Sequence, residues 1–180
     1  MRKNRQKIEL TGDEEQLVSF LLGKETFGVK VTQVREIGKV QDITKVPRMP
    51  DFIEGVMNLR GQITTVIDLK KRFAIAEDAN GRTAQSRIIV AEIGDTQLGI
   101  IVDAVEDVMR VPRQSISPPP RTLSTGMDTS FLTGICKLPN KLIMLLDLNK
   151  IIGDDDKERM AIKGQQGNGL ALNKVTTEAT

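Results

Sequence analysis

Short runs of apolar residues, separated by turns that contain glycine, occupy the middle of the chain. The runs 17–22 and 88–93 end at Gly23 and Gly94, and apolar positions resume four residues later in both. Two β-rich runs around a glycine turn predict a β-hairpin. After each hairpin the apolar spacing slips from every second residue to every third. A slip of this kind predicts a bulge or a sharp bend.

These segments form an internal repeat. Residues 17–37 align with residues 88–108 at an offset of 71, and residues 52–73 align with residues 131–152 at an offset of 79. Glycines coincide in both alignments, and an Asp-Leu pair follows the last apolar run of each copy. Ordered matches of this kind indicate a duplicated unit. Chance similarity between apolar strand segments is the alternative.

The short strands and regular turns predict an all-β fold with short helical turns, built as two five-stranded barrels that pack together. We expect the folded domain to span residues 16–152, with repeat one at about 16–80 and repeat two at about 86–152. The polar segments 1–15 and 153–180 are predicted to be a disordered arm and a mostly disordered tail.

Composition argues against nucleic-acid binding. The 180 residues include five Phe but no Trp or Tyr, which leaves few faces on which bases could stack. Lys and Arg total 26 against 24 Asp and Glu, a net charge of only +2. A duplex binder needs many phosphate contacts, and this charge balance does not indicate them.

The missing residue types argue against catalysis by common constellations. The chain has no His and a single Cys, Cys136, so no disulfide, metal site or cofactor is expected, and Cys136 is predicted to be a small buried hydrophobe. No apolar stretch suits a signal peptide or a membrane span, and the cytoplasm is the expected location. A carboxylate hydrolase centred on Asp103 and Asp107 is an alternative, although acidic residues near strand ends usually face solvent.

The turn 58–61, Asn-Leu-Arg-Gly, is the most informative motif. Gly61 supplies the positive φ that a two-residue hairpin turn favours. The second copy makes the matching turn with Pro139-Asn140, so the turn itself does not require an arginine. An exposed guanidinium suits docking to a carboxylate or to an amphipathic partner. The alternative is that Arg60 is a solvated turn residue.

Three other positions have structural explanations in the repeat. Val34 lies at the bend of repeat one, where its counterpart Val105 suggests that it fills the barrel. Gly55 recurs in the second copy, which indicates a backbone requirement. Asp68 recurs as well, and is predicted to cap the turn that follows a strand.

Taken together, four segments resemble the CheW family of chemotaxis coupling proteins over nearly the whole folded region. The most specific elements are the NLRG turn, the IDL that follows it and a V-x-E-I segment. The matching stretches are LVSFLLGKETFGVKVTQVREI, FIEGVMNLRGQITTVIDL, LGIIVDAVEDV and FLTGICKLPNKLIMLLDL. The stand-alone adaptor is the better match, because related proteins with CheW-like domains, CheV and CheA, carry further domains.

The resemblance implies two intertwined five-stranded barrels and a non-catalytic adaptor that links the cytoplasmic tips of chemoreceptors to the histidine kinase CheA. It implies a cytoplasmic protein that its partners recruit to membrane receptor arrays, with no membrane insertion of its own. The receptor-binding residues that it implies are Val34, Glu36, Gly55, Asn58 and Arg60. Kinase contact in the family uses barrel ends. We expect it partly in the second copy, without assigning residues.

One position departs from the family. Many members have a proline where this chain has Thr65, and its loss predicts a backbone N–H free for pairing at a sheet edge. Two other interpretations stay open. A tandem-barrel RNA- or ribosome-associated binder would need a basic stripe, whereas the basic run 70–72 stands nearly alone. A paralogous adaptor for surface motility would use a different receptor and kinase.

Overall fold

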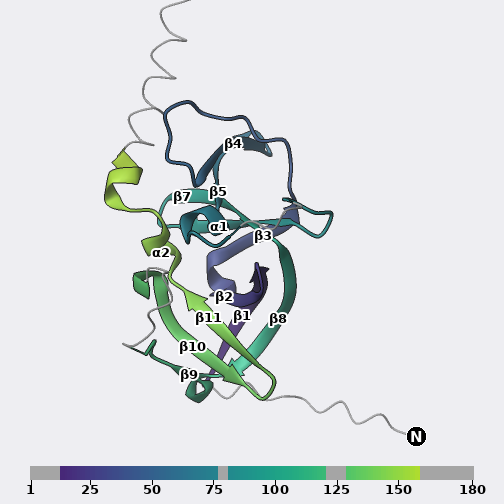
Figure 1. The fold of residues 1–180 in the computed structure, drawn as a ribbon, viewed down its shortest axis with the longest axis vertical. Coiled ribbons are helices and arrows are strands. Elements are labelled where there is room, and N and C mark those ends of the chain that lie inside the picture. The colour runs from purple at the N-terminus through teal and green to yellow at the C-terminus, as the bar shows by residue number, and fades with distance from the viewer. Residues whose placement is uncertain (1–12, 77–80, 121–128, 159–180) are drawn as a thin grey trace, which may run out of the picture. The chain divides into compact units, whose positions relative to one another are not determined.

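The computed structural model describes residues 13–76, 81–120 and 129–158 (Figure 1). The chain divides after Leu148 into two units, and both sheets belong to the first. The predicted arm lies outside the described residues up to residue 12, and the first strand begins at Glu14. The predicted tail lies outside them from residue 159 onward.

The elements confirm the repeat and the predicted all-β class. Repeat one contains β1 (Glu14–Leu22), β2 (Glu25–Lys30), η1 (Val31–Gln33), β3 (Val34–Lys39), β4 (Ile53–Leu59), β5 (Gln62–Asp68) and α1 (Leu69–Arg72). Repeat two contains β6 (Arg87–Ile93), β7 (Thr96–Val102), β8 (Ala104–Pro112), η2 (Arg113–Ser115), β9 (Ile116–Ser117), η3 (Thr129–Phe131), β10 (Leu132–Leu138), β11 (Lys141–Leu146) and α2 (Leu148–Ile151).

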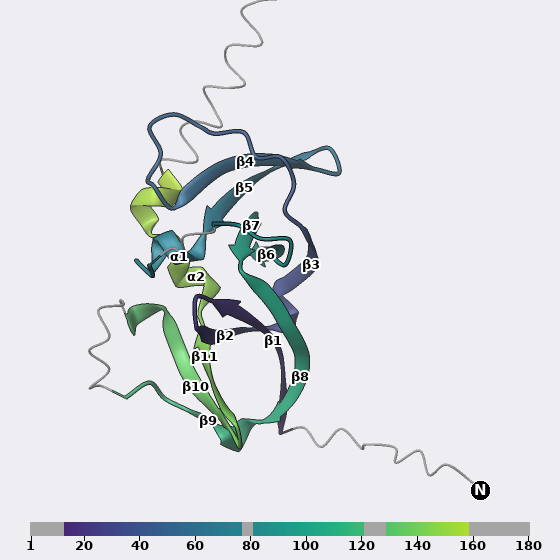
Figure 2. The ribbon, with the colours of Figure 1, turned by 45° about the vertical axis from the view of Figure 1, so that its right-hand side comes forward.

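The two repeats exchange their first hairpins. One sheet has the order β8-β1-β2-β11-β10-β9, so the β1–β2 hairpin of repeat one joins strands of repeat two. The other sheet has the order β3-β6-β7-β5-β4, so the β6–β7 hairpin of repeat two joins strands of repeat one. In Figures 1 and 2, β8 runs beside β1, as their antiparallel pairing requires. This exchange confirms the intertwined architecture.

The two sheets differ by one strand. The prediction of five strands holds for the sheet of β3 to β7, whereas the other sheet has a sixth strand, the two-residue β9. In the five-stranded sheet, the corresponding interaction is the isolated bridge between Thr44 and Val56. β9 forms two residue pairs with β10, whereas Thr44 and Val56 form one. The two sheets therefore differ by a single residue pair at this position.

Bends carry the chain from one sheet to the other. Between β2 and β3 the chain makes the 3-10 turn η1, and the pairing of β3 with β6 shifts register between Val34 and Glu36. In repeat two, Asp103 alone separates β7 from β8, and the pairing of β1 with β8 shifts register between Ser19 and Phe20. These irregularities confirm the bulges that the apolar spacing predicted.

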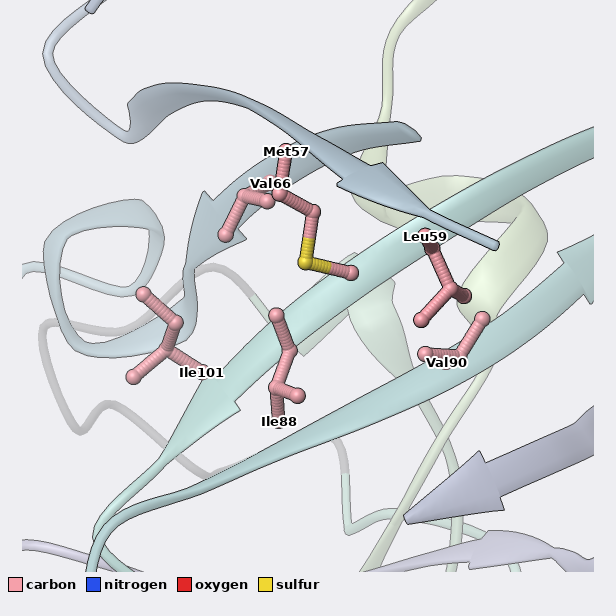
Figure 3. Packing of buried hydrophobic residues seen from close by; sticks show 6 residues of the cluster. All are labelled: Met57, Leu59, Val66, Ile88, Val90 and Ile101. Atoms are coloured by element: carbon pink, nitrogen blue, oxygen red, sulfur yellow. The ribbon is translucent and has the colours of Figure 1, made fainter. Parts of the chain in front are cut away.

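Each sheet buries its own apolar cluster. Figure 3 shows the cluster of the five-stranded sheet, in which side chains from four strands point toward one another. Its members are Met57, Leu59, Val66, Ile88, Val90 and Ile101. The cluster of the six-stranded sheet includes Cys136, which is fully buried as predicted, and burial raises the pKa of its thiol.

All five phenylalanines of the chain take part in one connected group. Phe27 stacks on Phe20 and on Phe73, with ring centroids 6.4 and 5.9 Å apart, and Phe73 lies 5.3 Å from Phe131. The guanidinium of Arg72 lies 4.6 Å from the Phe52 ring and 4.7 Å from the Phe131 ring. These contacts join two strands of the six-stranded sheet, β1 and β2, to residues next to β4, α1 and β10.

The prediction for Thr65 is wrong. Thr65 lies in β5, which pairs with β4 on one side and with β7 on the other. The position is therefore in the interior of the sheet and not at an edge. Sequence alone does not show this, because the β7 neighbour comes from the other repeat.

Candidate functional site

The β4–β5 hairpin ends in a tight turn formed by Arg60 and Gly61. Leu59 and Gln62 are the last paired residues, and the two turn residues have φ values of 52° and 83°. Two successive positive φ angles identify a type I′ turn, whose twist matches that of the strands. The side-chain oxygen of Asn58 accepts a hydrogen bond from the Gly61 N–H at 2.8 Å. Asn58 therefore stabilises the turn from within the hairpin.

Arg60 adopts a conformation that its own side chain disfavours. Left-handed backbone costs a non-glycine residue about 1–2 kcal/mol, and this turn type prefers Asn, Asp or Gly at its first position. The matching turn between Leu138 and Lys141 contains no positive φ. The fold can therefore close the equivalent hairpin of repeat two without a residue of positive φ. This favours a functional explanation for Arg60. The sequence predicted positive φ only at Gly61.

An ion pair links the turn to β3. The guanidinium of Arg60 lies 3.3 Å from the carboxylate of Glu36, and their side chains are 83% and 29% exposed. Exposed pairs contribute only about 0–1 kcal/mol to stability, so the main effect of this pair is to orient Arg60. Arg60 thus connects the β4–β5 turn, which Asn58 stabilises, with Glu36 of β3, and these three are predicted site residues.

Val34 lies next to this group, at the bulge that precedes Glu36. It pairs with Ala91 and is half-buried. Its counterpart Val105 is also half-buried and pairs with Phe20. Partial burial is compatible with both sequence interpretations, barrel filling and partner contact, and the receptor role of Val34 stays a prediction.

Gly55 has a strict backbone role. Its φ is 145°, and a Cβ atom there would lie 2.0 Å from the carbonyl oxygen of Thr44. Thr44 and Val56 exchange two backbone hydrogen bonds of 2.8 and 2.9 Å, which bring the strand this close. Gly134 faces the carbonyl of Ser117 in the same way. The repeat-based interpretation is confirmed, and a receptor contact by Gly55 stays a prediction.

The basic run 70–72 makes internal contacts instead of forming a basic stripe. Lys70 lies 2.9 Å from Asp103, Lys71 lies 2.5 Å from Glu54, and Arg72 stacks on two phenylalanine rings. Cations engaged in this way do not present a phosphate-binding surface. The geometry therefore does not favour the RNA-binding alternative.

Two carboxylates next to this run have shifted pKa values. Burial alone would raise the pKa of Glu54, but hydrogen bonds and charges from Lys71 and Arg82 outweigh it and lower that pKa. Burial raises the pKa of Asp68, and the charge of Glu54 adds to the rise. Asp68 accepts hydrogen bonds from the N–H groups of Lys70 and Lys71, which confirms the predicted cap.

The carboxylates of the hydrolase alternative have separate structural partners. Asp103 bonds to Lys70 and accepts the Gly23 N–H, Asp107 accepts the Val108 N–H, and Glu106 pairs with Lys141. Within the described ranges, no group of three potential ligands is arranged to hold a metal ion. In the same part of the chain, no helix has the length and apolar character needed to cross a membrane.

Comparison with known proteins identifies the family. The family model of the CheW-like domain matches residues 16–156. The chain belongs to this CheW family. The sequence resemblance is thereby confirmed.

Its relatives in the CheW family match over most of their length. Chemotaxis protein CheW of Treponema pallidum (strain Nichols) is 30% identical, over 86% of this chain and 91% of the relative. Chemotaxis protein CheW of Bacillus subtilis (strain 168) is 34% identical, over 84% of this chain and 94% of the relative. In the crystal structure of scaffolding protein TtCheW from Thermoanaerobacter tengcongensis, the matched chain has 42% sequence identity to this one and a TM-score of 0.73. The match covers 79% of this chain and 94% of that chain. The chain is a chemotaxis adaptor of the CheW family.

Proposed function

We propose that this adaptor couples the cytoplasmic tips of chemoreceptors to the histidine kinase CheA, without catalysis of its own. Receptor binding takes place at the β4–β5 hairpin and β3, through Arg60 and Glu36 with Val34, Gly55 and Asn58. The protein works in the cytoplasm, and its partners recruit it to receptor arrays at the membrane. Kinase contact lies partly in repeat two.

The observation that carries this proposal is the placement of Arg60. Its guanidinium is at an exposed turn, it is oriented by Glu36, and its backbone has an unfavourable φ that the equivalent turn avoids. A charged group held in this way is suited to a partner carboxylate, because guanidinium presents several N–H donors in a fixed plane. The internal contacts of Lys70 and Lys71 leave no comparable support for nucleic-acid binding by the basic run 70–72.

Co-sedimentation with receptor-containing membranes and CheA tests the proposal. We expect the wild type to bind both partners and Arg60→Glu to lose receptor binding while it retains kinase binding. Lys141→Glu is the matched control, because Lys141 is the cation at the other hairpin and pairs with Glu106 at 3.5 Å. It should retain receptor binding. A wild type that binds neither partner would refute the coupling role, whereas normal binding by Arg60→Glu would refute only the site.

A further inference from the structure

The described strands of the two sheets form separate ladders, and short crossings of the chain connect them. The chain passes from the six-stranded sheet to the five-stranded sheet at η1, and it returns at Asp103. A few residues between packed elements can act as a hinge. Side-chain contacts between the sheets therefore decide how firmly one sheet is oriented relative to the other.

Arg72 of α1 lies between two aromatic rings that belong to different sheets. Its guanidinium is 4.6 Å from the centroid of the Phe52 ring and 4.7 Å from that of the Phe131 ring. The Phe52 carbonyl accepts the N–H of Asp68 at the end of β5, and the Phe131 carbonyl accepts the N–H of Asp147 directly after β11. Each ring is thus attached to one sheet. A guanidinium that faces both rings is attracted to both.

The neighbours of Arg72 make contacts in the same direction. Phe73, directly after α1, stacks on Phe27 of β2, with ring centroids 5.9 Å apart. Lys70 pairs with Asp103, where the chain crosses to the six-stranded sheet. Because α1 directly follows β5, these contacts extend from the end of the five-stranded sheet toward the other one. We call Lys70, Arg72 and Phe73 the α1 clamp.

The repeat itself does not require the two cations of the α1 clamp. At the offset of 79, the counterparts of Lys70 and Arg72 are Asn149 and Ile151. The short helix α2 forms at the equivalent place without either cation. A nearly buried ammonium such as that of Lys70 has a desolvation cost. Its presence in one copy alone favours a role beyond closing the repeat.

We propose that the α1 clamp holds the two sheets in one orientation, and that this orientation carries the state of the receptor to the kinase. The inference rests on the proposed function. The receptor-binding elements of that proposal, β3 and the β4–β5 hairpin, lie in the five-stranded sheet, whereas four of the six described strands of repeat two lie in the other. Coupling between them passes through packed contacts between the sheets. Arg72 is therefore a positioning residue.

The first test measures the orientation of the sheets without any partner. Spin labels at Ile63→Cys and Leu142→Cys report the distance between β5 and β11, which lie in different sheets. Both positions are exposed, whereas the native Cys136 is fully buried and protected from labelling. We expect a narrow distance distribution with Arg72 and a broader one in Arg72→Met, which keeps an unbranched side chain between the rings but removes its charge.

The second test measures coupling in receptor-containing membranes with CheA. Arg72→Met should bind both partners as the wild type does, and should reduce the receptor-dependent change in CheA autophosphorylation about fivefold or more. Arg72→Lys should restore most of this change, because an ammonium also binds ring faces. Lys30→Met is the matched control for both tests, since the ion pair of Lys30 with Glu15 lies within the six-stranded sheet. It should behave as the wild type does.

Unchanged distances or unchanged kinase control in Arg72→Met would overturn the inference, as would loss of binding to either partner or equal effects of Lys30→Met. If urea denaturation shows that Arg72→Met is unfolded, Asp103→Asn takes its place, because it weakens the α1 clamp at Lys70. The same outcomes then decide. A wild type without receptor-dependent kinase control refutes the proposed function itself. Normal wild-type control with narrow distances in Arg72→Met refutes only the α1 clamp.

Discussion

The ammonium group of Lys70 lies 2.9 Å from the carboxylate of Asp103, and this pair connects the two repeats. Lys70 is in α1 of repeat one, and Asp103 is the residue between β7 and β8 of repeat two. The other oxygen of Asp103 accepts the N–H of Gly23 at 2.7 Å, in the turn between β1 and β2. One carboxylate thus joins elements associated with both sheets.

Removing the Asp103 charge should destabilise the fold. The Lys70 side chain is only 9% exposed, and a nearly buried ammonium that loses the charge of a carboxylate 2.9 Å away is destabilised. Because Asp103 is itself 26% exposed, solvent offsets part of this cost, and we expect Asp103→Asn to lower the free energy of unfolding by about 2 kcal/mol. Urea denaturation measures the change. Lys30→Gln, which removes a more exposed pair with Glu15, should cost less than about 1 kcal/mol. Equal effects would contradict this account.

Asp68 should make stability fall as pH rises. Burial first, and the charge of Glu54 second, raise its pKa in the folded protein. Between the ordinary and the raised pKa the folded state binds more protons than the unfolded state, so the free energy of unfolding decreases as pH rises through this range. Above the range, the full cost of the buried Asp68 charge remains. Asp68→Asn keeps an oxygen for the cap and removes the charge.

We therefore expect Asp68→Asn to be at least as stable as wild type at pH 7 and to lose this advantage in acid. Asp68→Ala should be about 1 kcal/mol less stable than Asp68→Asn at both pH values, because Ala loses the cap and neither residue titrates. Urea denaturation at pH 4 and pH 7 measures both. An Asn variant as unstable at pH 7 as the Ala variant would show that the carboxylate charge is required.

Gly55→Ala should be strongly destabilising. The new Cβ would meet the Thr44 carbonyl, and the φ of 145° disfavours any side chain. Strain and the loss of the two Thr44–Val56 bonds together cost about 2 kcal/mol or more. Gly38→Ala is the matched control, because a Cβ there has no atom within 4 Å. Thermal unfolding compares the two, and similar melting temperatures would show that the strand can move away from Thr44.

Arg60→Asn should separate stability from binding. Asn suits the first position of a type I′ turn better than Arg, whereas the lost ion pair with Glu36 is exposed and contributes little. We expect the free energy of unfolding to stay the same or rise by up to about 1 kcal/mol, while receptor binding is lost. Urea denaturation and co-sedimentation of one preparation measure both. A clear loss of stability would show that Arg60 serves the fold.

The sequence by itself determined the local structure of this protein. Strand boundaries follow the apolar alternation, glycine positions mark the turns, and the slips in spacing mark the bends at η1 and Asp103. These features depend on neighbours close along the chain, so their physical causes are readable in short windows. The NLRG turn was recognisable for the same reason, since its hydrogen bond joins residues three positions apart.

Only the tertiary structure decided which strands share a sheet. An apolar strand face records that it is buried but does not specify its neighbour. The apolar pattern therefore did not show the hairpin exchange, which only the family resemblance implied, nor the interior position of Thr65. The pairing of Arg60 with Glu36 and the grouping of all five phenylalanines have the same origin. Such contacts join residues far apart in sequence, and folding alone brings them within range.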